Sequence, residues 1–316
     1  MTLVLLTVAL AVALPWAAVP AARRLAGLLP PREASFALTG TAVLLAGGTV
    51  AALISLFHVP FLAGLERLPL ARVVAQWPAV VPVSCVAGVL LTAQVVRVSL
   101  AARRHRALLS RAWRLTGEGT ADGDLLVLPG EEAEAFALPR HRGHAGRVVV
   151  TEGMLRALRP SERAVLLAHE RAHLSGRHHL LSGIADLAAA VHPALGRLGS
   201  ALEFHLERWA DEAAARVVDD RRTAATAIAR AALAASAAPG RHGEGFLSVS
   251  TGPVPRRVEA LLGPEPAGPK GRGPRAVAAA LVTVVLVSAL LAMGLAYNLH
   301  EHVEHVAEMV TGRSRQ

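Results

Sequence analysis

The most informative stretch of this chain reads His169-Glu170-Arg171-Ala172-His173. Residues four apart lie on the same face of an α-helix, so the two imidazoles can converge on one metal ion. Glu170 is turned away from the line that joins them, where its carboxylate can reach a water bound to that ion. Zinc lowers the pKa of such a water toward neutrality, and a carboxylate can take its proton as the water attacks a peptide carbonyl. The spacing therefore predicts a zinc site with Glu170 as the catalytic base.

The residues before this motif favour a helix that carries it. Pro160 and Ser161 are followed by the mostly apolar run 164–168, which leads directly into His169. Serine is a preferred N-cap residue, and proline is common where helices begin. We therefore expect a helix over about 161–175, with Ser161 as its N-cap.

Two histidines leave a catalytic zinc site one ligand short, because such sites usually combine three protein ligands with a water. Acidic residues recur in the segment 200–218, which is rich in strong helix formers. Glu207 and Asp211 are four residues apart, so one carboxylate can bind the metal while the other orients a ligand imidazole. Glu203 is also four residues from Glu207, and the spacing alone leaves the choice of ligand open.

Taken together, these motifs resemble those of membrane-embedded zinc metallopeptidases. Two groups are similar: one contains the protease HtpX and the CAAX prenyl proteases, and the other contains the β-lactam sensor-transducers of the BlaR/MecR type. The resemblance rests on the stretches 165–173 and 207–212. It extends to 135–139 and 147–153, which are similar to a family hairpin, and to 256–262, an Arg-containing segment near the end of the domain. Roughly residues 120–265 are covered.

The resemblance implies roles for particular residues. In both groups, a Glu followed three and four residues later by a small residue and an Asp supplies the third metal ligand. Here that Glu is Glu207, which would join His169 and His173 in holding one zinc ion per chain. Glu170 would be the general base, and Asp211 would orient a ligand imidazole without touching the metal. The edge strand of the hairpin would hold an extended protein or peptide substrate.

Composition indicates a membrane protein independently of any motif. Hydrophobic residues make up 53% of the chain, and its mean hydropathy is +0.42, well above that of soluble domains. About 20 apolar residues suffice to cross a bilayer, and four segments meet this requirement: 3–21, 34–57, 80–98 and 277–297. The first has no basic residue before its apolar core and is followed by Arg23 and Arg24, which favours an anchor over a cleaved signal peptide.

Basic residues flank the region from about 99 to 275 on both sides, and the positive-inside rule then places this region in the cytoplasm. The N- and C-termini would lie outside. The predicted organisation is three transmembrane helices in 1–98, a cytoplasmic zinc metallopeptidase domain in 99–275, a fourth transmembrane helix in 276–298 and a short extracytoplasmic tail in 299–316. The flanking residues are Arg97, Arg103, Arg104, Arg106, Arg111 and Arg114 on one side, and Lys270, Arg272 and Arg275 on the other.

The predicted fold class is an α-helical integral membrane protein with four spans and a mainly helical α+β, zincin-like metallopeptidase domain. Short strands are expected at 124–128, 133–138 and 146–151, and further helices at 200–218 and 223–238. The run 180–190 is apolar but short and contains Asp186, so we expect a packed core helix rather than a fifth span. Gly/Pro-rich stretches at 239–253 and 263–274 are expected to be a loop and a linker.

Several features limit the other classes of function. The net charge of +9 is concentrated beside the spans, where anionic lipid rather than nucleic acid is the expected partner. Cys85 is the sole cysteine and lies in the third predicted span, which argues against a thiol catalyst. Lys270 is the only lysine among 33 basic residues, which together with the alanine content suggests a GC-rich bacterial genome and hence a bacterial cell membrane.

The remaining histidines leave alternatives open. His178 and His179 follow the motif helix closely and could line the site, but a solvated turn is the preferred interpretation. His205 and Arg208 flank Glu207 and are candidates to stabilise the oxyanion. The tail 300–305 contains three histidines that could bind metal weakly, although an exposed helical extension is the more common reason for such a run.

The predicted function is a membrane zinc endopeptidase that acts at the cytoplasmic face, in regulatory proteolysis or in quality control of membrane proteins. A transcriptional repressor is one candidate substrate. Only a short tail follows the fourth predicted span, so no penicillin-binding sensor domain is expected. The alternative is a signalling or scaffold membrane protein that keeps a zinc site without proteolytic turnover. Glu170 argues against it, because a purely structural site needs no base.

Overall fold

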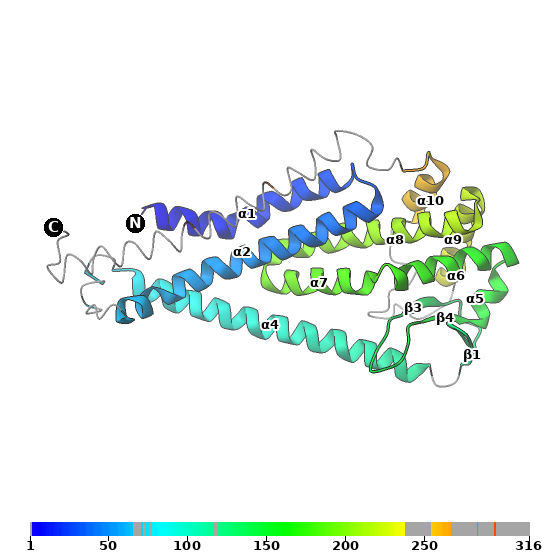
Figure 1. The fold of residues 1–316 in the computed structure, drawn as a ribbon, viewed down its shortest axis with the longest axis horizontal. Coiled ribbons are helices and arrows are strands. Elements are labelled where there is room, and N and C mark those ends of the chain that lie inside the picture. Colours follow the sequence, from blue (N-terminus) through cyan, green and yellow to red (C-terminus); the bar gives the residue numbers. More distant parts are fainter. Residues whose placement is uncertain are drawn as a thin grey trace.

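The computed structural model describes residues 2–65, 71, 74–75, 78–116, 119–237, 254–266, 283 and 294. Three long helices, α1 (Thr2–Ala26), α2 (Pro31–Leu65) and α4 (Val80–Leu115), run along the long axis of the molecule (Figure 1). A small sheet and several shorter helices gather at one end of them. The described part of the chain is therefore an elongated helical bundle that carries an α+β unit at one end.

Two of these helices are long and apolar enough to cross a membrane, over Pro31–His58 and Val80–Leu115. They coincide with the second and third predicted spans, and α1 covers the first. In α4, only 11% of the most apolar window is buried inside the molecule, and Val86, Val89 and Val95 are exposed. Such a surface suits contact with lipid. The fourth predicted span, 277–297, lies outside the described residues apart from two positions.

The apolar helix α2 contains hydroxyl side chains whose hydrogen bonds are made within the helix itself. Ser35 donates to the carbonyl of Pro31, Thr39 to that of Ser35 and Thr49 to that of Leu45, all at 2.8–2.9 Å. Each bond reaches one turn back along the helix, so no partner outside α2 is needed. These residues therefore lie in an apolar environment without leaving an unpaired donor.

The last turns of α4 lead into a four-stranded sheet with the order β1-β2-β4-β3. Its strands are β1 (Thr120–Asp122), β2 (Leu125–Leu128), β3 (Ala135–Leu138) and β4 (Arg147–Thr151). The expected hairpin is present as the antiparallel pair β3–β4, and β2 runs parallel to β4. The short strand β1 was not predicted. Strand β3 lies at one edge of the sheet, beside the helix that carries the motif.

The α part of this unit contains α5 (Glu152–Ala157), α6 (Pro160–Ser175), α8 (Gly196–Val218), α9 (Arg221–Ser236) and α10 (Val254–Leu262). The predicted motif helix is α6, but the prediction that Ser161 caps it is wrong. Pro160 is already its first helical residue. The backbone N–H of Arg159 donates to the carboxylate of Glu162 at 2.8 Å, so an acidic side chain three residues along helps to close this helix end.

Helix α7 (His178–Val191) and α8 form a hairpin, linked by a 3₁₀ turn (Pro193–Leu195), that packs along the long helices. Ala185 and Ala188 of α7 share one buried cluster with residues of α1, α2 and α8. The side-chain amide of Gln94 on α4 donates to the carbonyl of Val191 at 3.2 Å. Helix α7 is the packed helix that was expected at 180–190. The hairpin and the long helices share one continuous core.

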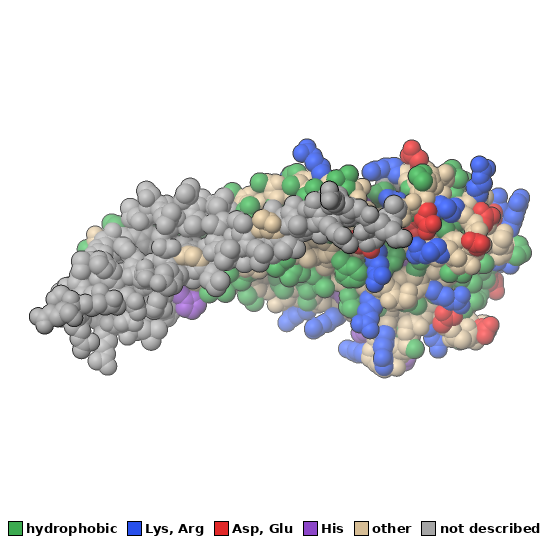
Figure 2. Space-filling model, turned by 45° about the horizontal axis from the view of Figure 1, so that its top comes forward, with side chains coloured by type: hydrophobic (Ala, Val, Ile, Leu, Met, Phe, Trp, Pro, Cys, Tyr) green, Lys and Arg blue, Asp and Glu red, His purple; other side chains and the backbone are tan. Residues whose placement is uncertain are grey.

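Charged side chains are unevenly distributed over the surface. On the face drawn in Figure 2, arginines and carboxylates gather over the end of the molecule that carries the sheet, α9 and α10. The part of the long helices visible beside them is mainly apolar. This division matches the sequence pattern, in which charged residues are concentrated between the third and fourth predicted spans.

Candidate metal centre

Helices α6 and α8 bring together the three residues predicted to be metal ligands. The Nε2 atoms of His169 and His173 are 3.1 Å apart. Glu207 of α8 places Oε2 at 3.5 Å from Nε2 of His169 and Oε1 at 3.4 Å from Nε2 of His173. The four-residue spacing on α6 aligns the imidazoles on one face, and α8 packs against that face. All three side chains thus point at one position.

These distances fit a tetrahedral ion. Zinc ligands lie at about 2.0–2.2 Å from the metal, which separates neighbouring ligand atoms by about 3.3–3.6 Å. The three measured separations, 3.1, 3.4 and 3.5 Å, scatter around that range. Among the described residues, this is the one group of three histidine and acidic side chains placed to hold a metal ion. Glu203, the alternative ligand, is exposed and does not belong to it.

Glu170 is buried beside the three ligands and is only 2% exposed. The backbone N–H of Ala137 on the edge strand β3 donates toward its carboxylate, and its Oε1 has no hydrogen-bond partner in the described part of the chain. Burial is the main cause that raises the pKa of Glu170 to about 7. A buried carboxylate with one oxygen free is placed to exchange a proton with a bound molecule.

Asp211 and Arg257 form the layer behind the ligands. Asp211 Oδ1 lies 3.0 Å from Nδ1 of His169, on the side of the ring that faces away from the metal position. Arg257 of α10 donates from Nε and Nη2 to both oxygens of Asp211, at 2.8 and 2.6 Å. Its Nη1 lies 2.8 Å from Oε2 of Glu207. A single guanidinium therefore positions one predicted ligand directly and another through Asp211.

The charge of this cluster also suits a divalent cation. Glu170, Glu207 and Asp211 carry three negative charges when ionised, against one positive charge on Arg257. Burial opposes the charged form of His169, but Asp211 and Glu207 raise its pKa to about 10. Burial lowers the pKa of His173 to about 4. Two negative charges remain when both rings are neutral, and a buried site of this kind is stable only if they are compensated.

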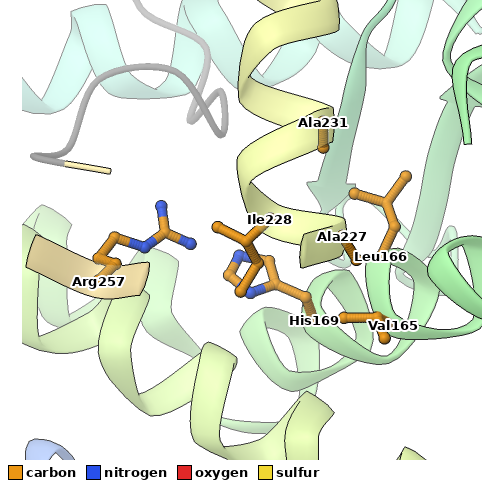
Figure 3. Close-up of a pocket in the computed structure, with 7 residues that line it drawn as sticks. All are labelled: Val165, Leu166, His169, Ala227, Ile228, Ala231 and Arg257. Carbon is orange, nitrogen blue, oxygen red and sulfur yellow. The ribbon is translucent and has the colours of Figure 1, made fainter. Parts of the chain in front are cut away.

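An apolar hollow lies behind His169. Val165 and Leu166 of α6 and Ile228 of α9 line it, with His169 and Arg257 facing it (Figure 3). Among the described residues, its lining is apolar apart from His169 and Arg257. It therefore encloses the rear of the cluster in an apolar wall, which strengthens the electrostatic interactions within it.

His178 lies against the site, so the preference for a solvated turn at this position is wrong. The side chain is 1% exposed, and its Nδ1 is 2.8 Å from Nδ1 of His173. His179 is half-buried. His205 is buried, but in the described part of the chain no hydrogen bond or ion pair connects it or Arg208 to the three ligands. The tail 300–305 lies outside the described residues.

Two contributors were incompletely recognised from the sequence. The segment 256–262 was singled out through its resemblance, but neither Arg256 nor Arg257 was assigned a role. The amphipathic pattern could have pointed to Arg257, because Arg257 and Leu261 are the two buried residues of α10 and lie four apart. The contact made by His178 depends on the turn between α6 and α7, which has no strong sequence signal.

The structure is mainly helical with two candidate membrane helices, and His169, His173 and Glu207 form a possible metal site of the kind that metallopeptidases use. Residues 120–196 match the sequence profile of Peptidase family M48. The chain is 43% identical over 68 residues to a Protease HtpX homolog of Acaryochloris marina, covering 21% of this chain and 23% of that protein. A Protease HtpX homolog of Aquifex aeolicus is 38% identical over 82 residues, 26% of each chain. The predicted resemblance to the HtpX group is thus confirmed.

The similarity covers only part of the chain. The matched part spans about a quarter of the length of these curated relatives, and no solved structure matches the chain. The family profile, over residues 120–196, includes the sheet, α5, α6 and α7, but it ends before Glu207, Asp211 and Arg257. The roles of the residues that α8 and α10 contribute to the site are therefore supported by the geometry described above and not by the family profile.

Proposed function

We propose that this protein is an integral-membrane zinc endopeptidase of the HtpX type. The observation that carries the proposal is the convergence of His169, His173 and Glu207, with Glu170 buried beside them. Zinc held by these three side chains would polarise the scissile carbonyl and acidify a water. The similarity to Peptidase family M48 over residues 120–196 supports the same reading.

Each residue of the cluster then has a distinct task. Glu170 accepts a proton at its free Oε1 and later returns one to the leaving amine. Asp211 accepts a hydrogen bond from Nδ1 of His169 and so keeps Nε2 free to bind the metal. Arg257 holds Asp211 and Glu207 in place and offsets part of their charge.

The substrate is proposed to be a protein or peptide that lies extended along β3. This strand is at the edge of the sheet, and the N–H of Ala137 already points toward Glu170. An extended chain can add to such an edge through backbone hydrogen bonds. The basic residues between the third and fourth predicted spans support a cytoplasmic location for this site. The cellular role would be regulatory proteolysis or quality control of membrane proteins.

The test compares Glu170→Gln with the matched variant Glu203→Gln in full-length protein purified in detergent. Zinc content and cleavage of β-casein, a disordered protein, are measured for each. Glu170→Gln should keep its zinc and lose activity by about 100- to 10,000-fold, the usual contribution of a general base. Glu203→Gln should match the wild type in both.

Two results would overturn the proposal. One is cleavage by Glu170→Gln at the wild-type rate, which would remove the assigned base. The other is a wild-type protein that binds zinc but cleaves neither β-casein nor any membrane protein in cells, as judged by comparing the membrane proteomes of wild-type and Glu170→Gln strains. That outcome would favour the scaffold alternative.

A further inference from the structure

The two histidine ligands have different partners behind them. His169 faces the carboxylate of Asp211. The Nε2 of His173 points at the metal position, 3.4 Å from Glu207, so a neutral metal-binding ring must carry its proton on Nδ1. That Nδ1 lies 2.8 Å from Nδ1 of His178. Since one of the two nitrogens must donate and the other accept, His178 has to present its unprotonated Nδ1 to His173.

We propose that His178 is a positioning residue for the metal ligand His173: it accepts a hydrogen bond from Nδ1–H of His173 and so fixes the tautomer and orientation of that ring. The proposal rests on the metal centre assigned above. A neutral imidazole here takes the place that a carboxylate or a backbone carbonyl usually occupies behind a ligand histidine. One ligand of the site thus has an anionic partner and the other a neutral one.

The turn between α6 and α7 brings His178 into this position. Arg177 adopts a left-handed backbone conformation, with φ 51° and ψ 40°. Non-glycine residues rarely adopt this conformation, and the surrounding structure must offset its steric cost. The chain reverses there, and His178 folds back over the end of α6. At Gly176, a Cβ atom would lie 2.5 Å from Nε2 of His178, so a larger residue there would displace the ring.

Packing then holds the ring of His178. The centroid of the His178 ring is 4.5 Å from that of Trp209 on α8. It is 4.7 Å from that of His173, and the rings of His178 and His173 are nearly perpendicular. Trp209 in turn contacts Phe36 and Arg32 near the start of α2. The ring therefore has little freedom to turn away from His173, as expected of a group whose task is to orient a ligand.

The test measures zinc affinity by competition with a chromophoric chelator, together with the visible absorption spectrum of the cobalt-substituted protein. His178→Phe keeps a ring beside Trp209 but removes the acceptor. His178→Asn places an amide oxygen where Nδ1 was and so restores the acceptor. His178→Ala is a second variant without an acceptor, in case the phenylalanine does not fit. His179→Phe is the control at the neighbouring, half-buried position.

We expect His178→Phe and His178→Ala to weaken zinc binding by about 10- to 100-fold and to shift the cobalt spectrum. His178→Asn should recover most of the affinity, and His179→Phe should behave as wild type. The proposal is overturned if the variants without an acceptor bind zinc as tightly as wild type, or if His178→Asn falls as far as His178→Phe. It is equally overturned if the wild type binds no zinc. Wild-type protein that binds zinc but lacks peptidase activity would contradict the proposed function alone.

Discussion

Arg257 forms a bidentate ion pair with Asp211, a residue 46 positions earlier in the chain, and both side chains are almost fully buried. Asp211 in turn contacts His169. Helix α10 is thereby connected to the metal centre through one carboxylate. Arg221 donates to the carbonyls of Ala260 and Leu261 near the end of the same helix and also pairs with Glu212 on α8. Two arginines thus fasten α10 against α8.

Arg257→Lys should weaken both the site and the fold. An ammonium group cannot bridge two oxygens of Asp211 and one of Glu207 in this geometry. Lysine keeps the positive charge but loses part of this hydrogen bonding. A lost hydrogen bond to a charged group typically costs about 1.5–3 kcal/mol, which here should appear as a lower melting temperature. Zinc affinity, measured with a chelator, should fall by about 10- to 100-fold. The neighbouring Arg256 is exposed, and equal losses in Arg256→Lys would contradict this account.

Glu207→Gln should abolish stoichiometric zinc binding, as should His169→Ala and His173→Ala. Each removes one of three converging ligands, and a site with two protein ligands holds zinc poorly. Metal analysis of the purified proteins measures this directly, with about one zinc per wild-type chain expected. Glu203→Gln should keep its zinc. A filled site in Glu207→Gln and an empty one in Glu203→Gln would reverse the assignment.

Gly153→Ala should disrupt the packing of the first turn of α5 against the loop between β2 and β3. A Cβ atom at this position would lie 2.1 Å from the backbone oxygen of Glu131, and backbone atoms cannot move aside as a flexible side chain can. Gly199 in α8 is the control, because a Cβ there meets no atom within 4 Å. Thermal unfolding should show a large loss for Gly153→Ala and none for Gly199→Ala, where replacing glycine in a helix favours folding. Equal melting temperatures would argue against this packing.

A reporter fused after residue 120 should behave as cytoplasmic, whereas one at the C-terminus should behave as external. The expectation follows from the basic residues on both sides of the region 99–275. Paired fusions to alkaline phosphatase and green fluorescent protein, which are active on opposite sides of the membrane, measure this. The reverse pattern would place the metal centre on the other side and change the compartment of its substrate.

The sequence by itself determined the elements whose signals are local. The spacing of His169 and His173 follows from the period of the helix, and the strands of the β3–β4 hairpin were predicted from short apolar runs between turn residues. The apolar segments at 34–57 and 80–98 likewise needed only composition and length. Even here the start of α6 was misplaced, because Pro160 and Glu162 compete with Ser161 as signals for the helix end.

Only the tertiary structure decided which distant side chains complete the site. Spacing left Glu203 and Glu207 as equal candidates, and the packing of α8 against α6 turned Glu207 toward the histidines. His178 was expected in a solvated turn, yet the left-handed Arg177 folds it back onto His173. Arg257 reaches Asp211 only because α10 packs on α8 and α9. Such contacts join residues that are far apart in the sequence. They depend on how side chains pack in three dimensions, and no local periodicity of the sequence encodes that packing.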